Sequence, residues 1–348
     1  MSPRIRTLQA QLPVATSLLV TDPLNIRYLS GFTGSFGYLF IGPEQSHLLT
    51  DSRYSIQSRE ETKDINIVIG RSVTDFIRDA STTAEILFES HHVTIDFHQQ
   101  LTQIERLNFL PAKSIVEKLR VVKDQQELAT MQQAGDISVA ALRLLIEQPL
   151  IGKTEKHIAT MLERYMIDLG AQKVAFDSIV ASGLHSAIPH HQPTDRILQV
   201  GDLLKIDFGA QVDGYKSDCT RTFVAGTPTQ FQCDLHTAVL HAQTVGRQEL
   251  RNEVQASQID AVVRTHLADH AYSATFQHGL GHGVGLAIHE DPFLSAKNDT
   301  RLTSGTVVTI EPGMYVESRG GVRIEDTVVI TDDGYRNLTD FPYDLISL

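Results

Sequence analysis

The sequence predicts a two-domain protein of the mixed α/β class. Its 348 residues exceed the usual size of a single domain, and its 41% hydrophobic content is sufficient for a full core. Short apolar runs typical of buried strands fill much of the first third, and strand-rich sequence interrupted by one helical block follows. We expect a smaller α/β domain at residues 1–115 and a larger α/β (α+β) domain at residues 116–348.

Several short strands are expected in the first domain. Turn residues bound apolar runs at 16–22, 37–42 and 65–70, and the run at 92–97 has the same character. The segment 46–62 begins as a strand and continues as a helix. These elements are enough for one small sheet with helices.

The second domain is predicted to begin with two helices. A helical period runs from about Asp124, and no Gly or Pro occurs between Ala112 and Ala134, so helices rather than a flexible tether should join the domains. A second helical period ends at Gly170. The remaining elements are expected as strands within 176–183, 203–226, 307–316 and 321–331, with a helical block over about 231–273.

Composition and charge exclude several functional classes. The net charge of −12 argues against a nucleic-acid-binding protein, because phosphate contacts need a basic face. No apolar run approaches the ~18–20 residues of a membrane span, and the N-terminal apolar stretch is too short and interrupted for a signal peptide. Two cysteines in different local contexts do not suggest a disulfide framework. We expect a cytoplasmic protein without nucleic-acid or membrane partners.

Two aspartates flank a turn in the strand-rich region. Asp207 and Asp218 lie on either side of Asp-Gly-Tyr at 213–215, so a hairpin would bring their carboxylates side by side. A bare pair would repel, and one partner would stay protonated unless a divalent cation lay between them. On spacing alone, a surface turn with two solvated acids is the better explanation.

Two glutamates lie in apolar strands, where burial of a charged side chain costs free energy. Glu311 follows four apolar or β-branched residues and precedes Pro-Gly, so it ends a buried strand. Glu325 is flanked by Ile324 and a Val/Ile run, and could pair with Arg323. Buried charges must be paired or coordinated. Together with the aspartates and the histidines described next, these glutamates favour a metal site.

The stretch HGLGHGVGLAIHEDP, residues 278–292, contains three histidines and four glycines. Histidine is the commonest metal ligand, and glycine permits close backbone approach, which we expect to bring this strand near the metals. Two aspartates, two glutamates and one histidine suit manganese, and also cobalt, zinc or iron. Four carboxylates carry more charge than one divalent ion needs, which favours a two-metal site and therefore hydrolysis.

The motifs IDFGAQVDGYKSDCTRTF, HGLGHGVGLAIHEDP, TIEPGMY and GVRIED occur in an order that resembles the pita-bread metallopeptidases. This family includes methionine aminopeptidases, Xaa-Pro aminopeptidases and prolidases, and the resemblance covers the chain from about residue 116. NIRYLSGFTGSFGYLFI and LLTDSRYSIQSREE resemble the creatinase-type N-terminal domain of the proline-specific members. The resemblance implies a C-terminal pita-bread fold with a curved, mainly antiparallel sheet, a smaller creatinase-like α/β domain and a homodimer.

The resemblance also implies a dinuclear centre. Its ligands would be Asp207, Asp218, His282, Glu311 and Glu325. Asp218 and Glu325 would bridge the ions, with Asp207 on one ion and His282 and Glu311 on the other. In the family's mechanism, water activated by the metals attacks the scissile carbonyl, and Glu311 handles the proton. Manganese is the expected metal, with cobalt or zinc as alternatives.

Two histidines would act as catalytic residues beside the metals. His190 would lie near the scissile bond, although its neighbour His191 could take this place if the loop were shifted. His289 would hydrogen-bond the peptide and the tetrahedral intermediate.

Three residues would bind substrate. His278 belongs to the pattern of the proline-specific members, but it could simply cap a strand. Arg323 could orient substrate or neutralise the acidic cluster, and Tyr315 could hydrogen-bond the site or pack.

The expected function is metal-dependent hydrolysis of an N-terminal Xaa-Pro bond in a proline-containing peptide. GFTGSFG and LLTDSRY favour an Xaa-Pro aminopeptidase, with an Xaa-Pro dipeptidase (prolidase) as the alternative. A more remote alternative is a creatinase-like protein without peptidase activity or a binding module. Such a protein should have lost metal ligands, whereas this chain keeps all five.

Overall fold

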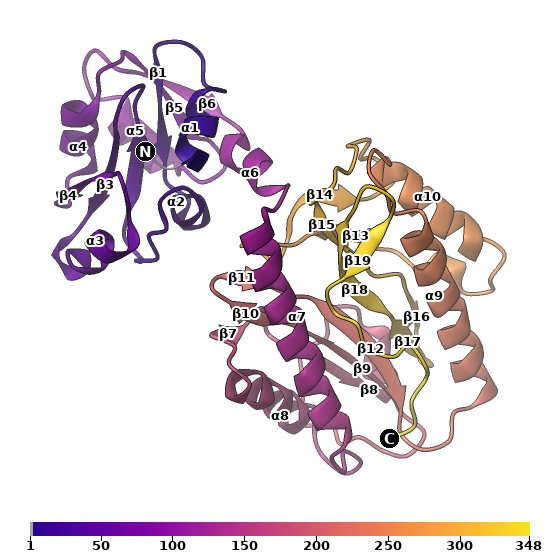
Figure 1. Ribbon diagram of the computed structural model, residues 1–348. Helices are drawn as coiled ribbons and strands as arrows, with labels where there is room; N and C mark the ends of the chain where they lie inside the picture. The colour runs from indigo at the N-terminus through magenta and orange to yellow at the C-terminus, as the bar shows by residue number, and fades with distance from the viewer. Residues whose placement is uncertain (1–2) are drawn as a thin grey trace. The chain divides into compact units, whose positions relative to one another are not determined.

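The computed structural model describes residues 3–348, which form two compact units divided between Arg120 and Val121 (Figure 1). Helix α6, Ile115–Arg120, belongs to the first unit, so the division falls after residue 120 rather than after residue 115. Both units combine helices and strands, as the mixed α/β class predicts. In the described part of the chain, no helix is both long and apolar enough to cross a membrane.

The first unit is built on one six-stranded sheet in the order β4-β3-β2-β1-β5-β6. The pairs β1–β2 and β2–β3 are antiparallel, whereas β3–β4, β1–β5 and β5–β6 are parallel. Its elements are α1 (Pro3–Gln9), β1 (Thr16–Val20), α2 (Pro23–Ser30), β2 (Tyr38–Ile41), β3 (Ser46–Thr50), η1 (Ser52–Tyr54), α3 (Gln57–Glu61), β4 (Asn66–Ile69), α4 (Val73–Ala80), β5 (Glu85–Glu89), α5 (Ile95–Leu101), β6 (Asn108–Ala112) and α6.

The strand expected at 92–97 is wrong. Residues Ile95–Leu101 form helix α5, and the strand of this region is β5, Glu85–Glu89. The side chain of Thr94 accepts a hydrogen bond from the backbone N–H of Phe97, which caps the helix. The short apolar run did not distinguish a capped helix start from a strand, because both contain few residues and no full period.

The second unit contains the longer helices and a large sheet. Its elements are α7 (Gln125–Ile146), α8 (Glu155–Asp168), β7 (Lys173–Val174), β8 (Ile179–Ser182), η2 (Gly183–Ala187), β9 (Leu203–Phe208), β10 (Ala210–Val212), β11 (Tyr215–Lys216), β12 (Cys219–Val224), α9 (Gln230–Gln248), α10 (Ala256–Leu267), η3 (Ser273–Thr275), β13 (Gly281–Gly283), β14 (Glu290–Leu294), β15 (Val307–Ile310), β16 (Gly313–Val316), β17 (Gly320–Arg323), β18 (Glu325–Ile330) and β19 (Tyr335–Asn337).

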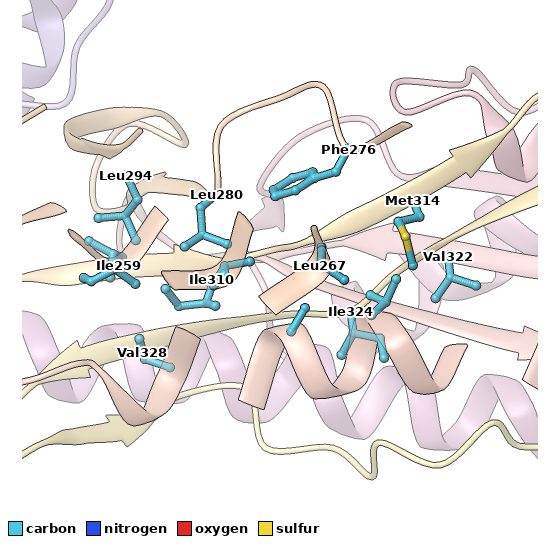
Figure 2. Packing of buried hydrophobic residues seen from close by; sticks show 14 of the residues in the cluster. Ile259, Leu267, Phe276, Leu280, Leu294, Ile310, Met314, Val322, Ile324 and Val328 are labelled. Carbon is cyan, nitrogen blue, oxygen red and sulfur yellow. The ribbon is translucent and has the colours of Figure 1, made fainter. Parts of the chain in front are cut away.

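The main sheet runs in the order β14-β13-β15-β18-β12-β9-β8, with β19 paired to β18, and its paired strands are antiparallel. Helices α7 and α8 share a hydrophobic core with β8, β9 and β12. Helices α9 and α10 share a second core with β15 and β18. Figure 2 shows this second core, where Ile259 and Leu267 of α10 pack near Ile310 and Val328. The mainly antiparallel sheet is as predicted.

Strand periodicity assigns polar side chains to the face away from these helices. Ile206 and Phe208 of β9 pack in the helix-covered core, so Asp207 between them projects from the opposite face. In β18, Asp326 accepts a hydrogen bond from Gln243 of α9, so the adjacent Glu325 projects away from α9. The side chains of Asp207 and Glu325 therefore project from the same face of the sheet.

Helix α9 contains a buried histidine that should make the fold sensitive to acid. His236 is 4% exposed, and burial lowers its pKa to about 4. The unfolded chain therefore binds this proton more readily than the folded protein. The stabilising effect of neutral His236 is present above pH ~6.5 and is lost as the pH falls towards 4.

We predict that, between pH 6.5 and 4, the wild type loses roughly 2 kcal/mol more of its free energy of unfolding than the His236→Gln variant does. Urea denaturation followed by circular dichroism across this range measures the effect. The matched control is His241→Gln, on the exposed side of the same helix. Identical acid dependence of wild type and His236→Gln would contradict this account.

Candidate metal centre

Three adjacent strands bring the predicted acids together. The expected hairpin is present: β10 and β11 pair across the turn at 213–215, and Asp218 immediately precedes β12. Asp207 of β9 and Glu325 of β18 both lie opposite Thr220 of β12. Asp207 is 8% exposed and Asp218 is 4% exposed, so the explanation as a surface turn with two solvated acids is wrong.

The other two predicted ligands come from the neighbouring strands β13 and β15. Glu311 directly follows β15, and its backbone N–H donates to the Leu280 carbonyl at 2.8 Å. His282 of β13 has its Nε2 atom 3.5 Å from Glu311 Oε1 and 3.7 Å from Asp218 Oδ2. Ligand atoms of Asp218, His282 and Glu325 all lie within 4.8 Å of one another.

The orientation of His282 directs one ring nitrogen at the acids. Its Nδ1 lies 3.1 Å from the Gly283 carbonyl, which makes this nitrogen the N–H donor and leaves Nε2 with a free lone pair. Burial lowers the pKa of His282 to about 4, so the ring is neutral near pH 7. A neutral imidazole with its lone pair towards carboxylates is the form that binds metal ions.

The charges of the cluster conflict unless cations are present. Burial and the neighbouring Glu325 raise the pKa of Asp218 well above its usual range, and burial and Glu311 do the same to the pKa of Glu325. Burial raises the pKa of Glu311 to about 8. Divalent cations would favour the ionised forms, because they replace water as the partners of the carboxylates.

The atoms of this cluster fit metal ions. Asp207 Oδ1 is buried and accepts no hydrogen bond. The separations of His282 Nε2 from the carboxylate oxygens exceed hydrogen-bond lengths, but they suit two ligands of one ion with metal–ligand bonds of about 2.0–2.2 Å. An oxygen-rich set with one imidazole accommodates manganese, cobalt or zinc.

A chain of hydrogen bonds connects the acids to the predicted substrate-binding residues. Arg323 forms an ion pair with Asp207, and its Nη1 donates to the Tyr315 hydroxyl at 2.9 Å. The Tyr315 hydroxyl lies 2.8 Å from His278 Nε2, while His278 Nδ1 lies 2.8 Å from the Gly279 carbonyl. Arg323 therefore contacts the acidic cluster directly, Tyr315 forms hydrogen bonds as well as packing, and His278 does more than cap a strand.

Burial shifts the pKa values of two residues in this chain of bonds. Burial raises the pKa of Tyr315 to about 12, so its hydroxyl keeps its proton. Burial and Arg323 lower the pKa of His278 to about 4. Neutral His278 donates a hydrogen bond from Nδ1 to the Gly279 carbonyl and accepts a hydrogen bond from the Tyr315 hydroxyl at Nε2. The ring of His278 is thus fixed by two partners.

The two predicted catalytic histidines lie near the buried cluster. His289 is exposed, and its ring centroid lies 4.3 Å from that of His282. His190 is also exposed and lies close enough to both His278 and His289 to lower their pKa values, after the larger effect of burial. His191 does not take its place, because His191 is 7% exposed and its Nε2 lies 2.8 Å from buried Glu155.

Sequence reasoning missed the polar residues that support the acids. The Thr220 hydroxyl donates to Glu325 Oε2 at 2.5 Å and accepts from Arg323 Nε at 3.0 Å. The Thr309 hydroxyl accepts the backbone N–H of His282 at 3.1 Å. Buried Lys205 precedes Asp207 by two residues on the same strand face. Its position in the apolar LLKIDF strand is a signal that could have identified it.

The glycines of the histidine-rich stretch permit close approach of neighbouring strands. A Cβ atom on Gly281 would collide with the Thr309 carbonyl oxygen, and one on Gly283 would collide with the Asp291 carbonyl oxygen. These contacts are with the neighbouring strands β15 and β14. The glycines therefore allow close strand packing on both sides of His282.

Comparison with known proteins agrees with this architecture. Residues 129–332 match the model of metallopeptidase family M24, and residues 4–122 match the creatinase/prolidase N-terminal domain. An Xaa-Pro dipeptidase of Pyrococcus horikoshii is 34% identical over 332 residues, covering 95% of this chain and 94% of the relative.

Two solved structures resemble the chain over nearly its whole length. An Xaa-Pro dipeptidase from Bacillus anthracis has a TM-score of 0.96 at 33% identity, covering 99% of each chain. An X-Pro aminopeptidase from Thermotoga maritima has a TM-score of 0.91 at 34% identity, covering 98% of this chain and 99% of that one. The predicted pita-bread fold with a creatinase-like N-terminal domain is confirmed. The chain belongs to metallopeptidase family M24.

Proposed function

We propose that this metallopeptidase is an Xaa-Pro dipeptidase that depends on two divalent metal ions. The observation that carries the proposal is the gathering of four carboxylates and one neutral imidazole on one sheet face, in a chain that belongs to family M24. The substrate class comes from the relatives named Xaa-Pro dipeptidase.

The proposed metal ligands are the five residues of the cluster: Asp207, Asp218, His282, Glu311 and Glu325. Together these five side chains would hold the two ions. When bound, the ions supply a water nucleophile at neutral pH and stabilise negative charge on the scissile carbonyl oxygen. Manganese is the proposed metal, and cobalt or zinc would suit the same ligands.

The remaining steps belong to side chains around the cluster. Glu311 would accept the proton of the attacking water at its carboxylate, because it lies at the end of β15 beside His282. His289 would donate a hydrogen bond to the carbonyl oxygen as negative charge develops there. His190, which is exposed and lies near His289, would contact the peptide near the scissile bond.

The residues linked by hydrogen bonds to Arg323 would bind and orient the peptide. Tyr315 and His278 are fixed relative to Asp207 through Arg323, so a peptide that packs against the His278 ring would be placed relative to the metals. Such fixed placement lowers the entropic cost of reaching the transition state. Proline lacks the backbone N–H that general peptidases use, which explains why Xaa-Pro bonds need a dedicated site.

The choice between dipeptidase and aminopeptidase rests on the relatives. The N-terminal motifs favoured an aminopeptidase, but relatives named Xaa-Pro dipeptidase fit the alternative better. An X-Pro aminopeptidase aligns with similar coverage, so the two activities share this architecture. A homodimer and a cytoplasmic location are further proposals, which follow from the family resemblance and from the sequence.

The remote alternative of a non-peptidase relative is not favoured. A protein that uses this scaffold without metals would have no need for a cluster of buried carboxylates. Here Asp218 and Glu325 are 4% and 2% exposed and face each other, and Asp207 has an unpartnered buried oxygen. Burying these carboxylates costs free energy unless cations bind them.

The substrate preference can be measured directly. Metal-stripped protein should gain activity with manganese and cleave an Xaa-Pro dipeptide much faster than the matching Xaa-Pro-Yaa tripeptide. Release of the first amino acid, followed by chromatography, is the measurement. Cleavage of the tripeptide alone would show an aminopeptidase. If neither peptide is cut while the protein still binds two metals, the proposed proline specificity is wrong.

Variants should separate metal binding from substrate contact. Asp218→Asn should lose bound metal and reduce kcat by more than ~10³-fold. His289→Ala should retain the metal and reduce kcat by about 10²–10³-fold, as for the loss of one oxyanion donor. Elemental analysis after dialysis gives metal content, and steady-state kinetics give kcat.

Asp213→Asn makes the same chemical change at the exposed turn of the hairpin and serves as the control. This control variant should keep its bound metal and its kcat. Full metal content in Asp218→Asn would refute its assignment as a ligand.

A further inference from the structure

One buried carboxylate binds the loop that carries His190. Glu155 is the first residue of α8 and is fully buried. Its Oε1 accepts the backbone N–H and hydroxyl of Ser182, at 2.7 and 2.8 Å, and lies 3.0 Å from His185 Nδ1. Its Oε2 lies 2.8 Å from His191 Nε2 and accepts the N–H and hydroxyl of Thr194, at 3.0 and 2.7 Å.

These partners bracket His190 in the sequence. Ser182 and His185 precede it, and His191 and Thr194 follow it. One carboxylate therefore ties both limbs of the segment 182–194 to the N-terminal end of α8. A carboxylate at a helix N-terminus is also favoured by the helix dipole.

The backbone just before His190 is held separately. Lys205 Nζ donates to the Ile188 carbonyl at 2.7 Å and to the Pro189 carbonyl at 3.4 Å. Arg323 Nη1 donates to the same Pro189 carbonyl at 3.2 Å. The backbone is thus bound on both sides of His190, while His190 itself is exposed.

The Glu155 cluster is saturated and needs no cation. Each carboxylate oxygen has three hydrogen-bond partners, so no lone pair is left for a metal ion. Burial alone would raise the pKa of Glu155, but the hydrogen bonds, that of His191 foremost, lower it to about 2. The ionised carboxylate is therefore the stable form, and its role is to organise the loop.

We propose that Glu155 is a positioning residue that acts through its loop to hold the His190 imidazole at the scissile bond. This inference rests on the proposed function of His190. Loops are mobile unless they are bound to rigid elements, and a catalytic side chain on a loop must be held within a fraction of an ångström. Helix α8 and strand β9 supply that rigid support.

Kinetics of Glu155→Gln test the proposal. The amide keeps one acceptor oxygen and replaces the other with a donor, so the bonds to one limb of the loop are lost. We expect kcat to fall about 10–100-fold, the scale of an ~1 Å misplacement, with KM changed less than about twofold and the metal content unchanged. In the His190→Ala background, Glu155→Gln should have no further effect on kcat.

The matched control is Glu89→Gln in the N-terminal unit. Glu89 is 4% exposed and accepts hydrogen bonds from the backbone of Thr21 and Asp22 and from the Asn25 side chain. The same substitution at this buried glutamate should affect stability without lowering kcat. If Glu155→Gln does not fold, His191→Leu, which removes one of the six contacts, should still lower kcat by about 3–10-fold.

Hydrogen–deuterium exchange keeps this test independent of the proposed reaction. Glu155→Gln should accelerate amide exchange in residues 182–194, even if the wild type does not cleave Xaa-Pro peptides. Absence of wild-type cleavage would refute the proposed function, whereas unchanged exchange would refute the role of Glu155 in ordering the loop. An unchanged kcat in an active enzyme, or full additivity with His190→Ala, would refute the positioning role.

Discussion

The second unit depends on one electrostatic constraint: four carboxylates lie together on one face of a sheet, largely shielded from water. Asp207, Asp218 and Glu325 are each less than 10% exposed, and Glu311 lies beside them. Burying such charges without partners costs several kcal/mol for each ion. Arg323 compensates one of them through Asp207. Divalent cations would resolve the remainder, and the same cations would provide the chemistry of a metallopeptidase.

Part of this site could be predicted from the sequence, because the relevant signals are local. The turn at 213–215 predicts the hairpin that brings Asp207 and Asp218 together, and isolated glutamates in apolar strands indicate ligation. The family resemblance added His190 and His289. The strand register that aligns Asp207 and Glu325 opposite Thr220 is a long-range property that spacing does not reveal.

Other features depend on contacts between distant segments. Glu155 precedes its partner Thr194 by 39 residues, and Lys205 contacts Ile188 across 17 residues. Nothing in the local pattern of α8 distinguishes Glu155 from an exposed helix-start acid. The close packing of the glycines around His282 against β14 and β15 likewise depends on strand neighbours that the sequence does not specify. In the first unit, residues 92–97 are too few to show a helical period, so the sequence does not distinguish a capped helix start from a strand.

The site is therefore organised in two layers. The inner layer consists of the carboxylates and His282, whose placement follows from strand alternation and register. The outer layer consists of Arg323, Tyr315 and Glu155, which fix the histidines around it through buried hydrogen bonds. Fully satisfied buried polar networks are rigid, which would suit the proposed role of these residues in orienting a peptide.

The most direct test of this account is calorimetric titration of the metal-stripped protein with manganese, combined with thermal unfolding. The account predicts two ions bound per chain and a marked increase in the unfolding temperature, since a ligand at about 1,000 times its Kd adds ~4 kcal/mol of stability. Binding of fewer than two ions, or an unfolding temperature that does not respond to manganese, cobalt or zinc, would contradict the claim that cations neutralise the buried carboxylates.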